Sequence, residues 1–176
     1  MQFLFGKEKL IARPSWIEIL RSLIGGTLSI LVLIFLGKYV GHIWIMAPFG
    51  ASCVLLYAAS QSPFSQPRNL IFGHLVAATI GLVLLKIFGS NVWTIALAVG
   101  LSISLMQFLR CVHPPAGATP LVILLGGSYV QFDWSFLIFP VFFGAIILVA
   151  IAYLVNNFRA TQKWPHYGLA LFHSKK

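Results

Sequence analysis

Acidic residues are almost absent from this sequence. Only three Asp and Glu occur in 176 residues, against twelve Lys and Arg, and all charged residues together make up 9%. Soluble domains carry about a quarter charged residues, so these charges are too few to cover a water-soluble surface. The three acids, Glu8, Glu18 and Asp133, lie outside the apolar segments, so we do not expect catalysis by paired carboxylates. Walker, dinucleotide and haem motifs are also missing, which predicts neither an enzyme nor a bound cofactor.

Cysteine is equally scarce. Cys53 and Cys111 lie in or beside apolar segments, without a CxxC pair or zinc-like spacing. We therefore expect two buried thiols and no metal site. The net charge of +9 gathers at the chain ends and in short breaks rather than along one polar face. This argues against nucleic acid as a partner and favours a lipid bilayer.

Apolar residues are abundant, at 59% of the chain. They form six segments: Leu20–Gly37, Ile43–Ala59, Leu70–Ile87, Val92–Leu109, Pro115–Val130 and Trp134–Val155. A helix needs about 20 apolar residues to cross a bilayer. Segments one, three, four and six meet this length, whereas segments two and five are shorter and broken by Pro and Gly. They are either short spans or re-entrant half-helices, and the predicted fold is an all-α polytopic transmembrane protein.

The distribution of basic residues predicts the orientation in the membrane. If all six segments cross, both termini and the 61–69 and 110–113 loops share one side. Ten Lys and Arg fall on that side, namely Lys7, Lys9, Arg13, Arg21, Arg68, Arg110, Arg159, Lys163, Lys175 and Lys176. The other side holds only Lys38 and Lys86, with the single acid Asp133. Because positive charge is retained inside, we predict a multi-pass plasma (inner) membrane protein with both termini cytoplasmic. Four spans with two re-entrant segments would predict the same.

These signals divide the chain into three parts. Residues 1–14 form a cytoplasmic N-terminal segment, residues 15–158 a transmembrane domain, and residues 159–176 a cytoplasmic tail. Ser15 and Glu18 resemble a capping box that opens the first helix of the domain.

Segments two and five share a short pattern. Pro48-Phe49-Gly50-Ala51-Ser52 and Pro115-Ala116-Gly117-Ala118-Thr119 both read P-x-G-A-[S/T], and each lies in the second of three apolar segments. Three crossings per half would invert the second half (89–158) relative to the first (15–88). Short, Gly/Pro-broken segments in corresponding positions then indicate a midplane site. Facing helix N-termini there would favour an anion. The alternative is that the glycines only let helices pack closely.

Four sequence blocks resemble the HPP family of integral membrane proteins. They are Ala47–Ser52, Ser65–Asn69 with Gly73-His74, His113–Thr119, and Asn156-Asn157, and together they cover about residues 15–158 in the expected order. The family is often described as four-spanning, and its plant plastid members are associated with nitrite uptake. The resemblance implies transport of nitrite or a similar anion.

Three further residues could contribute to such a site. Arg68 carries a planar, permanently charged guanidinium that suits an oxyanion, although a loop anchor is the alternative. His74 is an ionisable group inside a span, and a histidine bonded to a neighbouring helix is its structural alternative. His113 precedes two prolines and either caps the next helix or meets substrate. The predicted substrate-binding residues are Gly50, Ala51, Ser52, Arg68, Asn69, His74, His113, Gly117, Ala118 and Thr119.

The sequence thus predicts transport of a small monovalent anion, nitrite or nitrate first, by a homo-oligomer. A channel for small neutral solutes, or a non-transporting membrane scaffold or sensor, are the alternatives. The sequence leaves facilitated and proton-linked movement both open.

Overall fold

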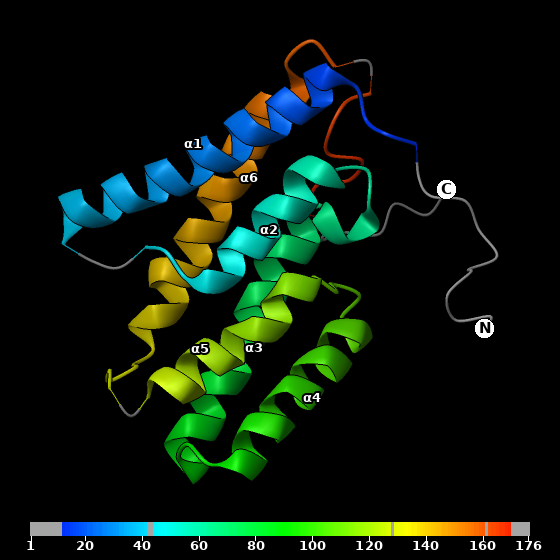
Figure 1. The fold of residues 1–176 in the computed structure, drawn as a ribbon. Helices are drawn as coiled ribbons and strands as arrows, with labels where there is room; N and C mark the ends of the chain where they lie inside the picture. The colour runs from blue at the N-terminus through cyan, green and yellow to red at the C-terminus, as the bar shows by residue number, and fades with distance from the viewer. Residues whose placement is uncertain (1–11, 42–43, 128, 161, 170–176) are drawn as a thin grey trace, which may run out of the picture.

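The computed structural model describes residues 12–41, 44–127, 129–160 and 162–169, and the regular elements in these ranges are all helical. In chain order they are α1 (Trp16–Val40), α2 (Ala47–Ala58), η1 (Pro63–Ser65), α3 (Pro67–Phe88), α4 (Val92–Phe108), η2 (Pro114–Ala118), α5 (Thr119–Gly126), η3 (Leu137–Phe142) and α6 (Phe143–Asn157), shown in Figure 1. The prediction of an all-α polytopic membrane protein is confirmed.

Each predicted apolar segment corresponds to one helix or to two consecutive helices. Three stretches are long and apolar enough to cross a bilayer: α1 with 25 residues, α3 with 22, and η3 with α6 as one 21-residue stretch. The other three, α2, α4 and η2 with α5, are apolar but have 10 to 17 residues. Helix α4 is shorter than expected for segment four. Its 17 residues extend about 26 Å at 1.5 Å per residue, slightly less than the roughly 30 Å hydrocarbon core.

Local chemistry explains where several helices begin and end. The Ser15 hydroxyl accepts from the Glu18 amide, and the Glu18 carboxylate accepts from the Ser15 amide, so the predicted capping box is present. Asn91 caps α4 by accepting from the amides of Trp93 and Thr94. Segment six is interrupted at Phe139, where the backbone is extended (φ −126°, ψ 118°) before Pro140. The residue before a proline avoids helical geometry, which the apolar pattern of the segment did not indicate.

Helix α3 lies at the centre of the molecule. Half of its most apolar window is buried, against 17% for α1, and it packs against α4, α5, η2, η3 and α6. Small residues allow this close packing. A Cβ on Gly73 would lie 2.8 Å from His113 Cβ, and one on Gly81 would lie 3.0 Å from Pro120 Cα. The small residues of α3 therefore decide how near η2 and α5 can approach.

Helices α1 and α6 pack together beside this centre, with α1 at the edge of the molecule (Figure 1). Large apolar side chains along α1 are exposed, including Ile17, Leu23 and Phe35. Such a surface suits lipid rather than water. The inner face of α1 meets α2, where Gly25 lies against the Tyr57 ring and Ser29 hydrogen-bonds the Tyr57 hydroxyl at 2.6 Å.

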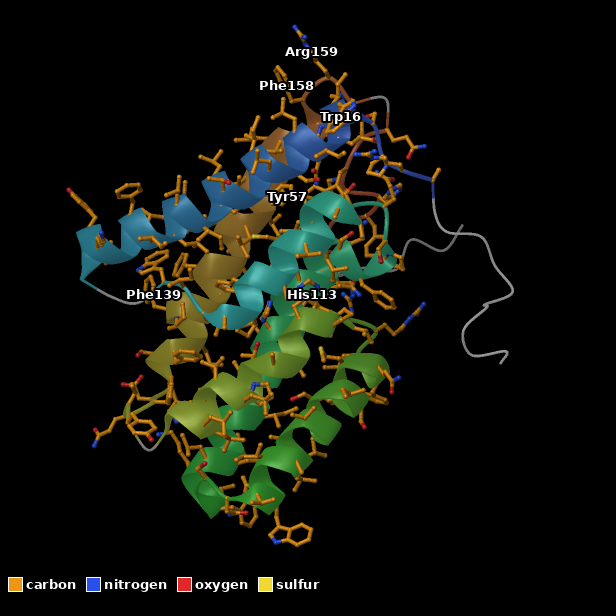
Figure 2. The ribbon with its side chains drawn as sticks, in the orientation of Figure 1. Trp16, Tyr57, His113, Phe139, Phe158 and Arg159 are labelled. Carbon is orange, nitrogen blue, oxygen red and sulfur yellow. The ribbon has the colours of Figure 1, made fainter. Side chains whose placement is uncertain are left out.

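Successive helices run in alternating directions, so α1 begins and α6 ends at the same end of the molecule (Figure 1). Trp16, Phe158 and Arg159 lie together there (Figure 2), and the Arg21 guanidinium donates to the Phe158 carbonyl at 3.2 Å. We call this the basic end; the described basic residues assigned to it from sequence are Arg13, Arg21, Arg68, Arg110, Arg159 and Lys163.

The opposite end carries few charges in the described part of the chain. Lys86 lies 5.9 Å from the Trp134 ring centroid, near Asp133. Hydrogen bonds from Ser135 hold the pKa of the exposed Asp133 carboxyl below its usual value. Lys7, Lys9, Lys175 and Lys176 lie outside the described residues. That the basic end is cytoplasmic stays a prediction, as does the two-fold relation between the halves 15–88 and 89–158.

Candidate functional site

Four polar side chains from different parts of the sequence meet in the interior. Ser52, His74, His113 and Thr119 are each 0% exposed. Buried polar groups are costly unless they are hydrogen-bonded, and these four bond to one another. We refer to them as the polar cluster.

The bonds of the polar cluster form one continuous chain. Ser52 Oγ lies 2.8 Å from His113 Nε2 and 2.9 Å from His74 Nε2. The other ring nitrogen of His74, Nδ1, lies 2.9 Å from Thr119 Oγ1. The other ring nitrogen of His113, Nδ1, lies 2.7 Å from the Phe64 carbonyl oxygen. Every ring nitrogen in the cluster thus has a partner.

Each member of the cluster comes from a different element. Ser52 lies in the second turn of α2, His74 lies in the first half of α3, and Thr119 is the first residue of α5. His113 is the N-cap residue of η2 and lies in the interior (Figure 2). Phe49 of α2 packs its ring edge against His74, with ring centroids 5.1 Å apart. The cluster therefore joins α2, α3 and the start of α5.

The two P-x-G-A-[S/T] motifs come together through this cluster. Ser52 ends the first motif and Thr119 ends the second, and both contact the ring of His74. Ser52 and Thr119, which carry the hydroxyls of the two motifs, were predicted site residues, as were the two histidines. The structure brings all four together.

The small residues of the motifs are not part of the polar cluster. Gly50 and Ala51 are exposed, and Gly117 and Ala118 are half-buried. A Cβ built on Gly50 or Gly117 meets no atom within 4 Å. Close packing within this chain therefore does not explain either glycine, in contrast to Gly73.

Arg68 and Asn69 lie at the basic end, at the start of α3. The Arg68 guanidinium donates to the carbonyls of Leu109 and Leu169 at 3.0 Å and lies 5.6 Å from the Phe72 ring centroid. Asn69 Nδ2 donates to the Val112 carbonyl at 2.7 Å. These two predicted residues thus hold the connection that carries His113.

The tail residue Tyr167 joins this group at the basic end. Its hydroxyl lies 3.0 Å from both the Pro63 carbonyl and Asn69 Oδ1. Partial burial raises the pKa of this phenol, and the Arg68 charge opposes the rise.

Two groups that support the site, the Phe64 carbonyl and Tyr167, could not be identified in the sequence from side-chain type. The Phe64 carbonyl accepts from His113, yet a backbone acceptor leaves no mark in a side-chain pattern. The flanking prolines, Pro63 and Pro67, were the available signal, because proline lacks an N–H and interrupts helical hydrogen bonding, which leaves nearby carbonyls to other donors. Tyr167 lies in the 159–176 tail, for which the sequence predicts a cytoplasmic location and no part in the site.

The remaining chemistry of the described residues is limited. Cys53 and Cys111 are free and buried, as expected. No group of three or more His, Cys, Asp or Glu in the described ranges could hold a metal ion. A cleft of about 950 Å³ opens at the basic end, lined by the beginning of α1, the residues that follow α2, and the end of α6. None of the four cluster residues lines this cleft.

Comparison with known families agrees with the motifs. The sequence model of the family described as HPP, transmembrane region, matches residues 11–165. This range contains all the blocks on which the resemblance was based and all ten predicted site residues.

Two curated relatives from Dictyostelium discoideum, both described as transmembrane proteins, are similar to this chain. One is 36% identical over 168 residues, which cover 91% of this chain and 54% of the relative. The other is 39% identical over 127 residues, which cover 70% of this chain and 45% of the relative. The chain therefore spans about half the length of the curated relatives it matches. No solved structure matches it.

Proposed function

The chain belongs to the HPP family of transmembrane proteins, and from that premise we propose that it moves a small monovalent anion, nitrite or nitrate, across the membrane. The observation that carries the proposal is the convergence of two equivalent motifs on one histidine. Ser52 and Thr119 bond opposite nitrogens of the His74 ring, in the interior of a chain that is otherwise mostly apolar. A polar group inside a membrane is costly, which makes a functional role the default expectation.

The character of the buried groups favours an anion over a cation. The buried polar side chains of the described residues are Ser, Thr, Asn, Gln and His, with no Asp or Glu among them. Ca²⁺ and Mg²⁺ prefer oxygen ligands such as carboxylates, whereas hydroxyl, amide and ring N–H donors suit an anion. The basic end adds a positive potential that would attract an anion from solution.

The glycines indicate where the anion would approach. Gly50 precedes Ser52 by two residues, and Gly117 precedes Thr119 by two residues. The space beside each glycine is open. A missing side chain lets a ligand approach the backbone closely, and helix N-termini offer unpaired N–H groups. We place the transported anion beside this backbone, next to the polar cluster.

Replacement of these glycines tests the proposal. Gly50→Val and Gly117→Val should abolish nitrate and nitrite flux in liposomes, because the new side chains fill the proposed approach to the site. Both variants should fold, since a Cβ at either position has no protein atom within 4 Å. Gly100→Val on α4 is the matched control, because its Cβ also meets nothing within 4 Å, and it should retain wild-type flux.

The same assay separates the alternatives. Wild-type flux in both motif variants would reject the anion site and leave the glycines without a role in transport. Uptake of small neutral solutes that does not change with anion concentration or with membrane voltage would favour a channel for neutral solutes. No flux of either kind in the wild type would favour a scaffold or sensor.

Two further parts of the proposal concern the cellular context. We propose that the chain lies in the plasma (inner) membrane and works as a homo-oligomer. A mass of 19.4 kDa gives little protein around a central pathway, and the exposed Gly50 and Ala51 would be shielded from lipid by a second copy. Crosslinking through a cysteine at position 51, in a chain lacking Cys53 and Cys111, should yield dimers in the membrane. If every introduced cysteine has reacted with the crosslinker and only monomer is found, the homo-oligomer is rejected.

A further inference from the structure

We propose that the polar cluster binds a single proton and that this proton crosses the membrane together with the anion. This inference rests on the proposed function and adds its coupling ion. It follows from the direction of the hydrogen bonds, from the freedom of one hydroxyl to turn, and from the absence of a counter-charge among the described residues.

One backbone carbonyl determines the direction of every bond in the neutral cluster. The Phe64 oxygen can only accept, so His113 Nδ1 carries hydrogen and donates to it. In a neutral ring, His113 Nε2 is then an acceptor, and it receives the Ser52 hydroxyl hydrogen. Ser52 has no second hydrogen, so His74 Nε2 must be the donor to Ser52 Oγ.

The same reasoning fixes the end of the chain. With hydrogen on Nε2, neutral His74 presents an acceptor at Nδ1, and the Thr119 hydroxyl donates to it. The neutral cluster is therefore a single file of donors, running from Thr119 through His74, Ser52 and His113 to the Phe64 carbonyl. Both histidines are held as defined tautomers.

The cluster also has a prepared arrangement for one added proton. A proton on His113 Nε2 turns that atom into a donor towards Ser52 Oγ. The Ser52 hydrogen then turns to the Pro48 carbonyl, one helical turn back and 3.2 Å away. Ser52 Oγ has two lone pairs and accepts from both histidines, so every polar atom keeps a partner. The proton enters without breaking the ring contacts.

The two histidines cannot both be charged. Their ring centroids lie 5.1 Å apart, and two positive charges at that distance in a low-dielectric interior repel strongly. The cluster consequently holds one proton at a time.

No carboxylate among the described residues is available to balance that charge. The described acids are Glu18, bonded to Ser15, and Asp133, bonded to Ser135. None of the titratable or charged side chains on the elements packed around the cluster is a carboxylate: they are Cys53 and Tyr57 of α2, Arg68 and Lys86 of α3, Arg110 and Cys111 in the 109–113 connection, and Lys163, His166 and Tyr167 of the tail.

A buried charge without a partner is disfavoured, so the charge must come with a balancing ion. A monovalent anion beside Gly50 and Gly117 would balance a protonated His113, and the proton would in turn favour the anion. By linkage, each increases the affinity for the other by the same factor. The pair is neutral, which lowers the cost of crossing the hydrocarbon.

Proton movement with nitrate tests this inference. The full chain is placed in liposomes that contain a pH-reporting dye, with potassium and valinomycin holding the voltage at zero. Nitrate is the probe because its conjugate acid is strong and does not leak across as a neutral molecule. An inward nitrate gradient should acidify the interior with one proton per nitrate, and an inward proton gradient of one pH unit should accumulate nitrate about tenfold. Protein-free liposomes are the blank.

The variant His113→Gln tests the assigned residue. Glutamine cannot be protonated in this range, so the pH gradient should no longer accumulate nitrate. Gly100→Val should couple as the wild type does. The ratio of one proton per nitrate is measured in the wild type. The coupling is therefore tested even if His113→Gln folds poorly.

Two outcomes are distinguishable. Nitrate flux in the wild type without proton movement would overturn the coupling and leave the proposed function standing. Absence of nitrate flux in the wild type would overturn the proposed function, and the coupling with it.

Discussion

His74 and Thr119 are joined by a hydrogen bond of 2.9 Å between Nδ1 and Oγ1, although they lie 45 residues apart in the chain. The bond joins the first half of α3 to the first residue of α5. Together with the Ser52 bond to Nε2 on the same ring, it makes His74 the residue through which the two P-x-G-A-[S/T] motifs are connected. The contact between the two motifs thus depends on one buried histidine.

Removal of the Thr119 hydroxyl should lower stability. Thr119→Val keeps the shape of the side chain but leaves His74 Nδ1 without its donor. Hydrogen bonds between membrane helices contribute about 0.6 kcal/mol on average and up to about 1.7 kcal/mol. We expect a loss of free energy of unfolding near the upper value, because the bond is fully buried, measured by chemical denaturation in detergent micelles.

Thr119→Ser is the control for this experiment, because it retains the hydroxyl and should lose less stability than Thr119→Val. Equal stability of the valine variant and the wild type would show that His74 Nδ1 does not need this partner.

A methyl group at Gly144 should destabilise the packing of α6 on α2. A Cβ there would lie 2.5 Å from Phe49 Cε2 and 3.4 Å from the Trp44 carbonyl oxygen. Phe49 is fully buried and has little freedom to move, and overpacking of this kind costs about 1–3 kcal/mol. The melting temperature of Gly144→Ala in detergent should fall clearly, whereas Gly100→Ala, with nothing within 4 Å of its Cβ, should melt within a degree or two of the wild type. Similar melting of both variants would contradict the packing described for Phe49.

The orientation in the membrane is open to direct labelling. In a chain with Cys53→Ala and Cys111→Ala, a cysteine at Lys163 should react with an impermeant maleimide only after the membrane is opened. A cysteine at Ser90, beyond the far end of α3, should react from outside. The reason is the retention of positive charge on the cytoplasmic side and the gathering of Arg21, Arg68 and Lys163 at one end. The reverse pattern would invert the orientation, and labelling of both from outside would contradict the alternating course of the helices.

The sequence by itself determined the helical class, the six apolar segments and the repetition of the P-x-G-A-[S/T] motif. These depend on local properties: hydropathy over about 20 residues, capping by Ser15, and the positions of Pro and Gly. Ser52, His74 and Thr119 were also identifiable, because polar groups inside apolar segments stand out against their surroundings, and His113 was identifiable because it directly precedes two prolines. The break at Phe139 and the short α4 were less clear, because a run of apolar residues indicates a span without fixing where its backbone bends or ends.

Only the tertiary structure decided which of these groups meet. Ser52, His74 and His113 are brought into one chain of bonds by the approach of α2, α3 and the 109–113 connection, and that approach depends on the missing side chain of Gly73. It also decided that Arg68 and Asn69 bond backbone carbonyls of the connection leading to His113, and that Gly50 and Gly117 face open space. Hydrogen bonds between distant residues depend on the rotation and depth of each packed helix, and neither quantity is encoded in the spacing of residues along the chain.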